Sequence, residues 1–161
     1  MTRTCTRNLV AGAMMLFSMG AWAQTLQTMP FGTPIGNDAA RKMGAAALAE
    51  AKKNNWPMSI AIVDYHGELV YFERMDNAQI ASVNLALGKA RTSAQLKRPS
   101  KALEDAIAGG RNALLRLGDV TPIQGALPIV IDGKFVGAIG VSGMASNQDE
   151  QVAAAGLAAL K

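Results

Sequence analysis

The chain has 161 residues, of which 16 are Lys or Arg and 12 are Asp or Glu, giving a formal net charge of +4. With one cysteine and one histidine, it excludes a disulfide-stapled scaffold and a metal cage built from several Cys or His side chains. The basic residues form no stripe of the kind that binds a phosphate backbone, which argues against a nucleic-acid partner.

The N-terminus has the pattern of a bacterial secretory signal peptide over residues 1–23. Arg3 and Arg7 precede an apolar run that ends in Ala21-Trp22-Ala23, a small-x-small cleavage site. We therefore expect cleavage after Ala23 and a periplasmic or secreted protein, with no stable membrane insertion once the short apolar run is removed. Cleavage leaves 14 basic residues against 12 acidic ones, a net charge of +2, and removes Cys5.

The pattern of residues 24–36 predicts an N-terminal arm, and the pattern from residue 37 onward predicts the start of one domain. The arm has two prolines, two glycines and no clean hydrophobic period, so it is expected to be extended, with the ordered domain over residues 37–161. A helix is expected from Asn37 to about Lys53. Two β-rich runs at 58–64 and 68–73 then form a hairpin around Tyr65-His66-Gly67.

Helices and a second hairpin are expected in the remaining residues. An apolar stripe that includes Ile80 predicts a helix at 78–94, and a further helix and a short helical piece are expected between 99 and 117. Asp132-Gly133 favours a tight turn between the apolar runs 127–131 and 135–141, and a last helix follows from about Ser146. The order α-β-β-α-α-β-β-α predicts an α+β fold with helices packed on one antiparallel sheet.

The strand expected at 135–141 has one bulky and one smooth face. The bulky face is expected to carry Phe135, Ile139 and Val141, and the smooth face Ala138, Gly140 and Ser142. Small side chains let either a helix or a flat ligand approach the backbone closely. Gly140 and Ser142 are therefore candidate ligand contacts, with helix packing as the alternative.

Short motifs along nearly the whole expected domain carry a family resemblance. They are Val63-Asp64 with Gly67, RMDNA at 74–78, Lys89-Ala90, Pro122 with Gly125 and Leu127-Pro128, Asp132-Gly133, VGAIGVSG at 136–143 and QDEQVAAAGL at 148–157. Together they resemble the GlcG/HbpS-like haem-binding family and are similar to the C-terminal domain of PduO-type corrinoid adenosyltransferases. The resemblance implies a profilin- or PAS-like fold, haem as a cofactor and a homo-oligomer.

The chain departs from the usual family pattern at two positions where relatives commonly carry glycine. Asn77 stands at one of them, and asparagine tolerates a left-handed backbone better than most residues, so the turn is expected to survive. Ala126 stands at the other and lacks that tolerance, so the resemblance does not by itself predict the geometry of the loop at 121–126.

Arg74 and Lys89 are the candidate contacts for an anionic ligand. Haem propionates, or the carboxylate of a small acid, need a cation that pairs with them. Lys89 follows Ser82 by two helical turns, which predicts a polar strip beside the apolar one. The competing interpretation is a solvated surface strip, with Arg74 paired to Glu73 or Asp76.

His66 and Met75 are the candidate axial ligands of a haem iron. His66 lies at the expected tip of a turn, where a solvated polar residue is the ordinary expectation. Met75 follows a strand, where methionine more often fills a core. A carboxylate-only metal site using Glu68, Glu73 or Asp76 has no supporting spacing, and no catalytic set is visible.

Three classes of function remain open from the sequence. The first is a non-catalytic periplasmic protein that binds haem in a cleft between the sheet and the 78–94 helix. The second is an enzyme or accessory factor for a small hydroxy acid or aromatic carboxylate, held by Arg74 and Lys89. The third is a structural interaction module whose small-residue faces are oligomer contacts.

Overall fold

The computed structural model describes residues 26–160, so the expected signal peptide, its cleavage site, Gln24 and Lys161 lie outside the described residues. The elements are α2 (Asn37–Lys53), β1 (Ser59–Asp64), β2 (Leu69–Arg74), α3 (Ser82–Leu96), α4 (Lys101–Ala108), the 3₁₀ helix η1 (Asn112–Arg116), β3 (Ala126–Ile131), β4 (Lys134–Ser142) and α5 (Ser146–Ala158). Their order confirms the predicted α+β fold. No helix within residues 26–160 is long and apolar enough to cross a membrane.

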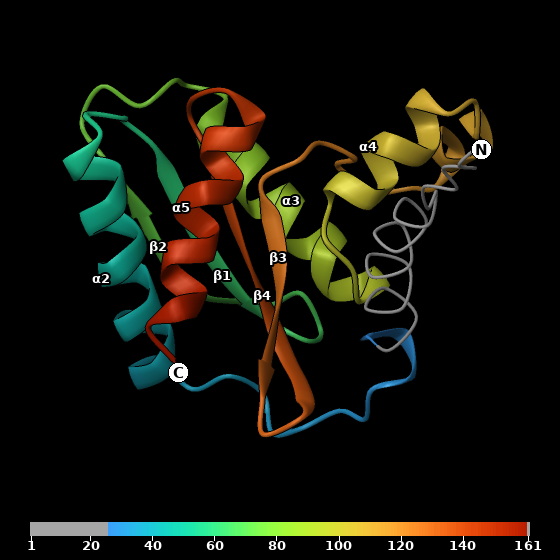
Figure 1. The fold of residues 1–161 in the computed structure, drawn as a ribbon, viewed down its shortest axis with the longest axis horizontal. Coiled ribbons are helices and arrows are strands. Elements are labelled where there is room, and N and C mark those ends of the chain that lie inside the picture. The colour runs from blue at the N-terminus through green and yellow to red at the C-terminus, as the bar shows by residue number, and fades with distance from the viewer. Residues whose placement is uncertain (1–25, 161) are drawn as a thin grey trace, which may run out of the picture.

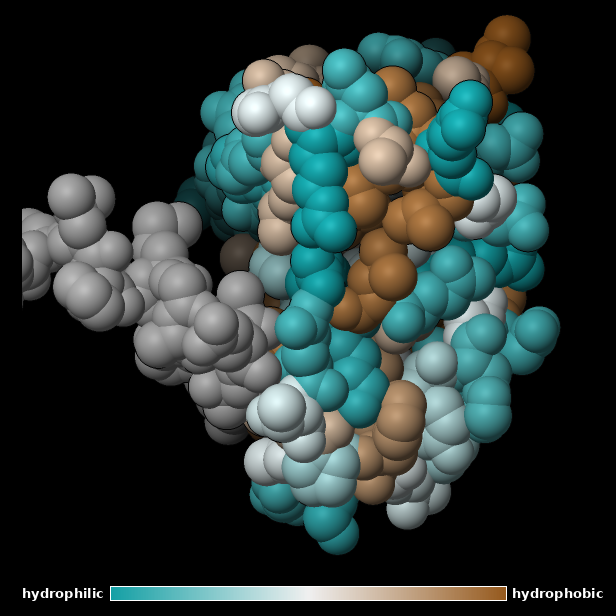
Figure 2. All heavy atoms as spheres, turned by 90° about the vertical axis from the view of Figure 1, so that its right-hand side faces the viewer, coloured by the Kyte–Doolittle hydropathy of each residue, from teal (hydrophilic) through white to brown (hydrophobic). Residues whose placement is uncertain are grey.

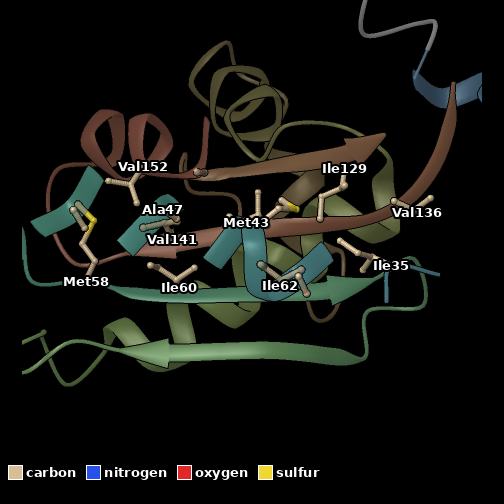
Figure 3. Packing of buried hydrophobic residues seen from close by; sticks show 14 residues of the cluster. Ile35, Met43, Ala47, Met58, Ile60, Ile62, Ile129, Val136, Val141 and Val152 are labelled. Atoms are coloured by element: carbon tan, nitrogen blue, oxygen red, sulfur yellow. The ribbon is translucent and has the colours of Figure 1, made fainter. Parts of the chain in front are cut away.

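The four strands form one antiparallel sheet in the order β2-β1-β4-β3, with helices on both faces (Figure 1). Both central strands are buried, and alternate side chains point to opposite layers. Ile60 and Ile62 of β1 belong to the core beneath α2 and α5, whereas Ala61 and Val63 belong to the core beneath α3. Figure 3 shows the first of these cores between the helices and the sheet.

The smooth face of β4 is occupied by α3. A Cβ atom on Gly140 would lie 2.6 Å from the backbone nitrogen of Ala90 and would collide with the carbonyl oxygen of Ala86. The helix thus rests directly on the strand backbone, and no flat ligand fits between them at this point. The prediction of a ligand cleft between the sheet and the 78–94 helix is therefore wrong, because the helix itself fills that space.

Phe135 lies on the α3 side of the sheet, so its expected place beside Ile139 is wrong. The pairing of β3 with β4 shifts after Ile129↔Gly137, and the next pair is Val130↔Phe135. Val136 is the extra residue of this bulge, and it packs with the Ile139 core while Phe135 packs with Ala138. A bulge inserts one residue and thereby reverses the alternation before it, which the strict period of two misses.

Helix α3 begins at Ser82, four residues later than expected. Asn77 has φ +64°, so the expected left-handed turn is present here and separates β2 from the helix. Gln79 Nε2 donates to the carbonyl oxygen of Gly143 at 3.0 Å and holds the connecting loop against the end of β4. Ile80 is consequently 90 % exposed and is no part of an apolar helix face.

The second departure from the family pattern is absorbed by the neighbouring residue. Gly125 has φ +128°, whereas Ala126 is the fully buried first residue of β3 and pairs with Gly140. The positive φ falls on glycine, so alanine at 126 adopts an ordinary extended backbone without strain.

Gly140→Ala is expected to destabilise the fold by about 1–3 kcal/mol, because the added methyl group overpacks the contact between β4 and α3. Urea denaturation followed by circular dichroism measures the change. Gly118→Ala is the matched control, since an added Cβ there meets nothing within 4 Å and its φ is not positive. Equal stability of the two variants would contradict the close approach.

Candidate functional site

A pocket of about 430 Å³ lies beside α3, where three separate segments meet. Its lining residues come from the β1–β2 turn, from α3 and from the loop before β3: His66, Gly67, Glu68, Gly88, Arg91, Gln95, Asp119, Val120 and Thr121. Its volume falls within the range of about 300–1,000 Å³ typical of small-molecule sites.

The β1–β2 turn that presents His66 is rigidly hydrogen-bonded. Asp64 accepts from the backbone nitrogens of His66 at 2.8 Å and Glu68 at 3.0 Å through the same oxygen, Oδ1. Gly67 takes φ +88°, which suits glycine, and its carbonyl oxygen accepts from Arg91 Nε at 3.1 Å. The turn is thereby fixed both to its own strand and to α3, with the His66 side chain exposed.

Arg91 is the cation of the pocket. Its Nε is used by Gly67, but its guanidinium forms no ion pair among residues 26–160, which leaves its terminal nitrogens for an anion. Two carboxylates, Glu68 and Asp119, also line the pocket, and both are exposed. An anionic ligand is therefore favoured on the Arg91 side of the pocket and disfavoured near these two acids.

The third wall is held against α3 by threonine contacts. The backbone nitrogen of Thr121 donates to Thr92 Oγ1 at 2.7 Å. A side chain on Gly88 would collide with the Thr121 hydroxyl, so this glycine lets the loop lie directly on the helix. The pocket wall is thus built from backbone and small side chains.

Lys89 and Asp149 form a buried ion pair away from this pocket. Lys89 Nζ lies 2.7 Å from Asp149 Oδ2 and 3.2 Å from the carbonyl oxygen of Val141, and both side chains are 2 % exposed. Asp149 Oδ1 also accepts from the backbone nitrogen of Met144 at 3.1 Å. Burial raises the pKa of the Asp149 carboxyl, and the hydrogen bond from Lys89 opposes that rise.

Gly125 makes room for this ion pair. A Cβ there would lie 2.9 Å from Lys89 Nζ and 2.8 Å from the Cβ of Asp149. The pair links α3 on one face of the sheet with the first turn of α5 on the other (Figure 1). The polar strip expected through Ser82 and Lys89 consequently faces inward, with Ser82 hydrogen-bonded to Ser59 at 2.8 Å.

The remaining predicted site residues lie at the other end of the sheet from His66. Arg74 and Ser142 both flank Ser59 in the strand register, and Arg74 Nη2 donates to the carbonyl oxygen of Ala78 at 3.4 Å. Met75 follows Arg74 and packs against the core beneath α2 and α5. His66 and Met75 are separated by the hairpin, about 20 Å for six residues, so one chain does not bring both to one iron.

The predicted ligand contacts Ser142, Gly140 and Lys89 are all buried. Ser142 is 5 % exposed, and Gly140 is covered by α3. No group of three or more His, Cys, Asp or Glu side chains is arranged to hold a metal ion within residues 26–160, so the carboxylate-only metal site is not formed there. The structure thus brings His66 together with Arg91 and not with Arg74 or Lys89.

Sequence reasoning missed Arg91 and the partner of Lys89. Gly88, Arg91 and Gln95 lie three and four residues apart, which places them on one face of a helix, and this polar stripe was a usable signal. Asp149 lies in the first turn of α5, where the helix dipole alone accounts for an acidic residue. It lies 60 residues from Lys89, and no spacing rule connects the two.

A family model described as "Haem degrading protein HbpS-like" matches residues 35–158, nearly all of the described chain. The chain belongs to the HbpS-like family. The resemblance read from the motifs is thereby confirmed, and the match covers every segment of the pocket and both members of the buried ion pair.

Similar proteins and solved structures agree with this assignment. Protein GlcG of Escherichia coli K12 is 41 % identical over 98 residues, which cover 61 % of this chain and 73 % of GlcG. A crystal structure of HbpS superposes with a TM-score of 0.75 at 30 % identity, covering 83 % of this chain and 95 % of that one. A crystal structure of a PduOC–haem complex gives 0.73 at 28 % identity, covering 80 % and 96 %.

Lys89→Met is expected to cost about 3–5 kcal/mol of stability, because it leaves the Asp149 carboxylate buried without its partner. Thermal and urea denaturation measure the loss. The double variant Lys89→Met/Asp149→Leu removes both charges and is expected to recover most of it.

The exposed pair Lys101–Asp105, 2.6 Å apart, supplies the matched control for this test. Lys101→Met makes the same chemical change on the surface and is expected to cost less than about 1 kcal/mol. A similar small loss at Lys89, or a double variant that adds both single losses, would show that the buried pair is not coupled as the structure indicates.

Proposed function

We propose that the protein binds haem at the pocket beside α3 and acts as a non-catalytic accessory or sensory protein. The observation that carries the proposal is that the only histidine of the chain shares this pocket with Arg91, a cation without an ion-pair partner among residues 26–160. Membership in the HbpS-like family and the fold shared with the PduOC–haem complex support haem as the ligand.

His66 fits the role of axial ligand by its chemistry and exposure. Its imidazole is exposed at the pocket, while its backbone is fixed by Asp64, so the ring is accessible on a rigid support. An imidazole nitrogen is a common protein ligand of haem iron, and bound haem would supply an iron whose spectrum reports that ligand.

Arg91 fits the role of propionate partner. A guanidinium forms strong, directional hydrogen bonds with a carboxylate, and Arg91 already has one nitrogen fixed on Gly67. Gly67 directly follows His66 in the sequence. The hydrogen bond from Arg91 to the Gly67 carbonyl oxygen therefore fixes the position of the guanidinium relative to the imidazole. Glu68 and Asp119 repel a carboxylate, which directs the propionates toward Arg91.

A haemin titration tests the proposal. We expect a saturable Soret spectrum with wild-type protein and a changed Soret position with His66→Ala, because the axial ligand is lost. Arg91→Met is expected to weaken binding about 10- to 100-fold, which corresponds to one charge-assisted hydrogen bond. Absorbance spectroscopy measures both changes.

Arg41→Met is the matched control for Arg91→Met. Arg41 is on α2, on the opposite face of the sheet, and its Nε donates to Asn37 Oδ1 at 2.7 Å. Haem affinity is expected to stay at the wild-type value in this variant. Haemin binding that fails to saturate, or that ignores both His66 and Arg91, would count against the proposal, and binding of small carboxylic acids that depends on Arg91 would then support the alternative ligand class.

We also propose that the protein is exported to the periplasm or the medium after cleavage behind Ala23, and that it works as a homo-oligomer. The N-terminal pattern of basic residues, apolar run and small-x-small site supports export. Exposed apolar side chains support self-association. Figure 2 shows apolar side chains gathered between polar borders on the side that carries α4, and Leu115, Leu117 and Ile123 near this helix are exposed.

Native mass spectrometry of the exported protein tests location and assembly together. We expect a subunit that begins at Gln24 and a particle containing more than one copy. An uncleaved subunit retained in the cytoplasm would contradict export, and a single-copy particle at micromolar concentration would contradict the oligomer.

A further inference from the structure

Residues 29–35, the part of the N-terminal arm meant by "the arm" from here on, lie beside the start of β4 in the position that β1 occupies farther along that strand. The last pair of β1 with β4 is Asp64↔Gly137, and beyond it the arm hydrogen-bonds to β4. Phe135 donates to the carbonyl oxygen of Pro30 at 2.9 Å and accepts from Gly32 at 2.9 Å. The backbone nitrogen of Ile35 donates to the carbonyl oxygen of Val136 at 3.1 Å, so the arm is docked by backbone hydrogen bonds.

This docking places Phe31 in a row of rings that ends at His66. The Phe31 and Tyr65 ring centroids are 5.1 Å apart at an interplanar angle of 54°. The Tyr65 and His66 centroids are 4.3 Å apart at 48°. The Phe31–Tyr65 distance lies in the favourable range of about 4.5–7 Å for aromatic pairs, and the Tyr65 and His66 rings lie closer still, so Tyr65 connects the arm to the imidazole.

Lys97 fastens the arm from α3. Its Nζ donates to the carbonyl oxygen of Met29 at 2.8 Å and lies 3.5 Å from the centroid of the Phe31 ring, a cation–π contact. The Lys97 backbone is left-handed with φ +47° at the end of the helix. Helix α3 therefore holds the arm through Lys97 and the histidine turn through Arg91.

Phe31 is not explained as a core residue. It is 57 % exposed, yet its ring contacts Tyr65, Lys97 and Phe135, whose centroid is 6.0 Å away. Because the Phe31 ring is largely exposed, these oriented contacts indicate a role in positioning neighbouring side chains more than a role in burying apolar area. No residue of the arm lines the pocket itself.

We propose that Phe31 and Tyr65 are positioning residues that hold the His66 imidazole in the orientation that binds haem iron, with the docked arm as their support. For the haem readout this inference rests on the proposed function. It makes the haem affinity of the pocket depend on a segment that does not contact the pocket.

The first test follows the His66 ring in the protein without haem. The chain has one histidine, so ¹³C-labelled histidine gives ring signals from a single residue. Tyr65→Leu and Phe31→Ala are expected to shift these signals, because the adjoining ring is lost or released. Tyr65→Phe is expected to keep the wild-type shifts, since it preserves the ring.

The second test measures haemin affinity of the same variants. Phe31→Ala is expected to weaken binding about 2- to 10-fold, the loss corresponding to one aromatic pair, and Phe31→Trp is expected to restore it. Ile80→Ala is the control. It also removes an exposed apolar side chain, but one that follows Gln79, whose side chain donates to Gly143 at the other end of the sheet. Both readouts are expected to stay unchanged.

The outcomes separate this inference from the proposed function. Unchanged His66 signals in Phe31→Ala overturn the positioning role, and so do shifted signals with unchanged haemin affinity. If wild-type protein does not bind haemin, the proposed function fails, and the His66 signals alone then decide whether Phe31 positions the ring. Loss of affinity in the Ile80→Ala control as well would also overturn the inference.

Discussion

The direct contact of α3 with the backbone of β4 is the constraint on which the rest of the structure depends. It exists because β4 carries Gly140 where the helix crosses, and because α3 carries the small residues Ala86 and Ala90 at the same place. A helix seated this closely has little freedom to slide, since any added atom meets backbone on the other side. Its outward face then fixes Arg91 at the pocket, and its end fixes Lys97 at the arm.

The buried ion pair complements this contact by joining the two helical layers. Lys89 reaches from α3 past Gly125 to Asp149 in α5, and each charge has a further hydrogen bond to backbone. Such pairs add little net stability compared with apolar packing, because both charges lose their hydration. Their effect is selective: an arrangement of the layers that separates the charges leaves two buried ions unpaired, so the pair specifies how α3 and α5 sit across the sheet.

The proposed binding pocket depends on rigidity more than on apolar enclosure. Its three walls are each fixed to α3 or to the sheet by named hydrogen bonds, so little ordering remains to oppose a ligand. In the proposed function, recognition falls on one imidazole and one guanidinium, and two exposed carboxylates restrict where an anion can lie. The same rigidity explains how a docked arm that lies outside the pocket connects to it, through the ring of Tyr65.

The sequence by itself determined the element order, both hairpins, the positive φ at Asn77 and the family, because these depend on local turn chemistry, hydrophobic period and motif content. It also identified the smooth face of β4, although not which partner covers it. Only the tertiary structure decided that a helix fills that face, that a bulge turns Phe135 toward α3, and that Lys89 pairs with Asp149. Likewise only the fold brought Arg91 to His66 and the arm to Tyr65. Contacts between residues tens of positions apart depend on how the layers pack, and no local period or spacing encodes that packing.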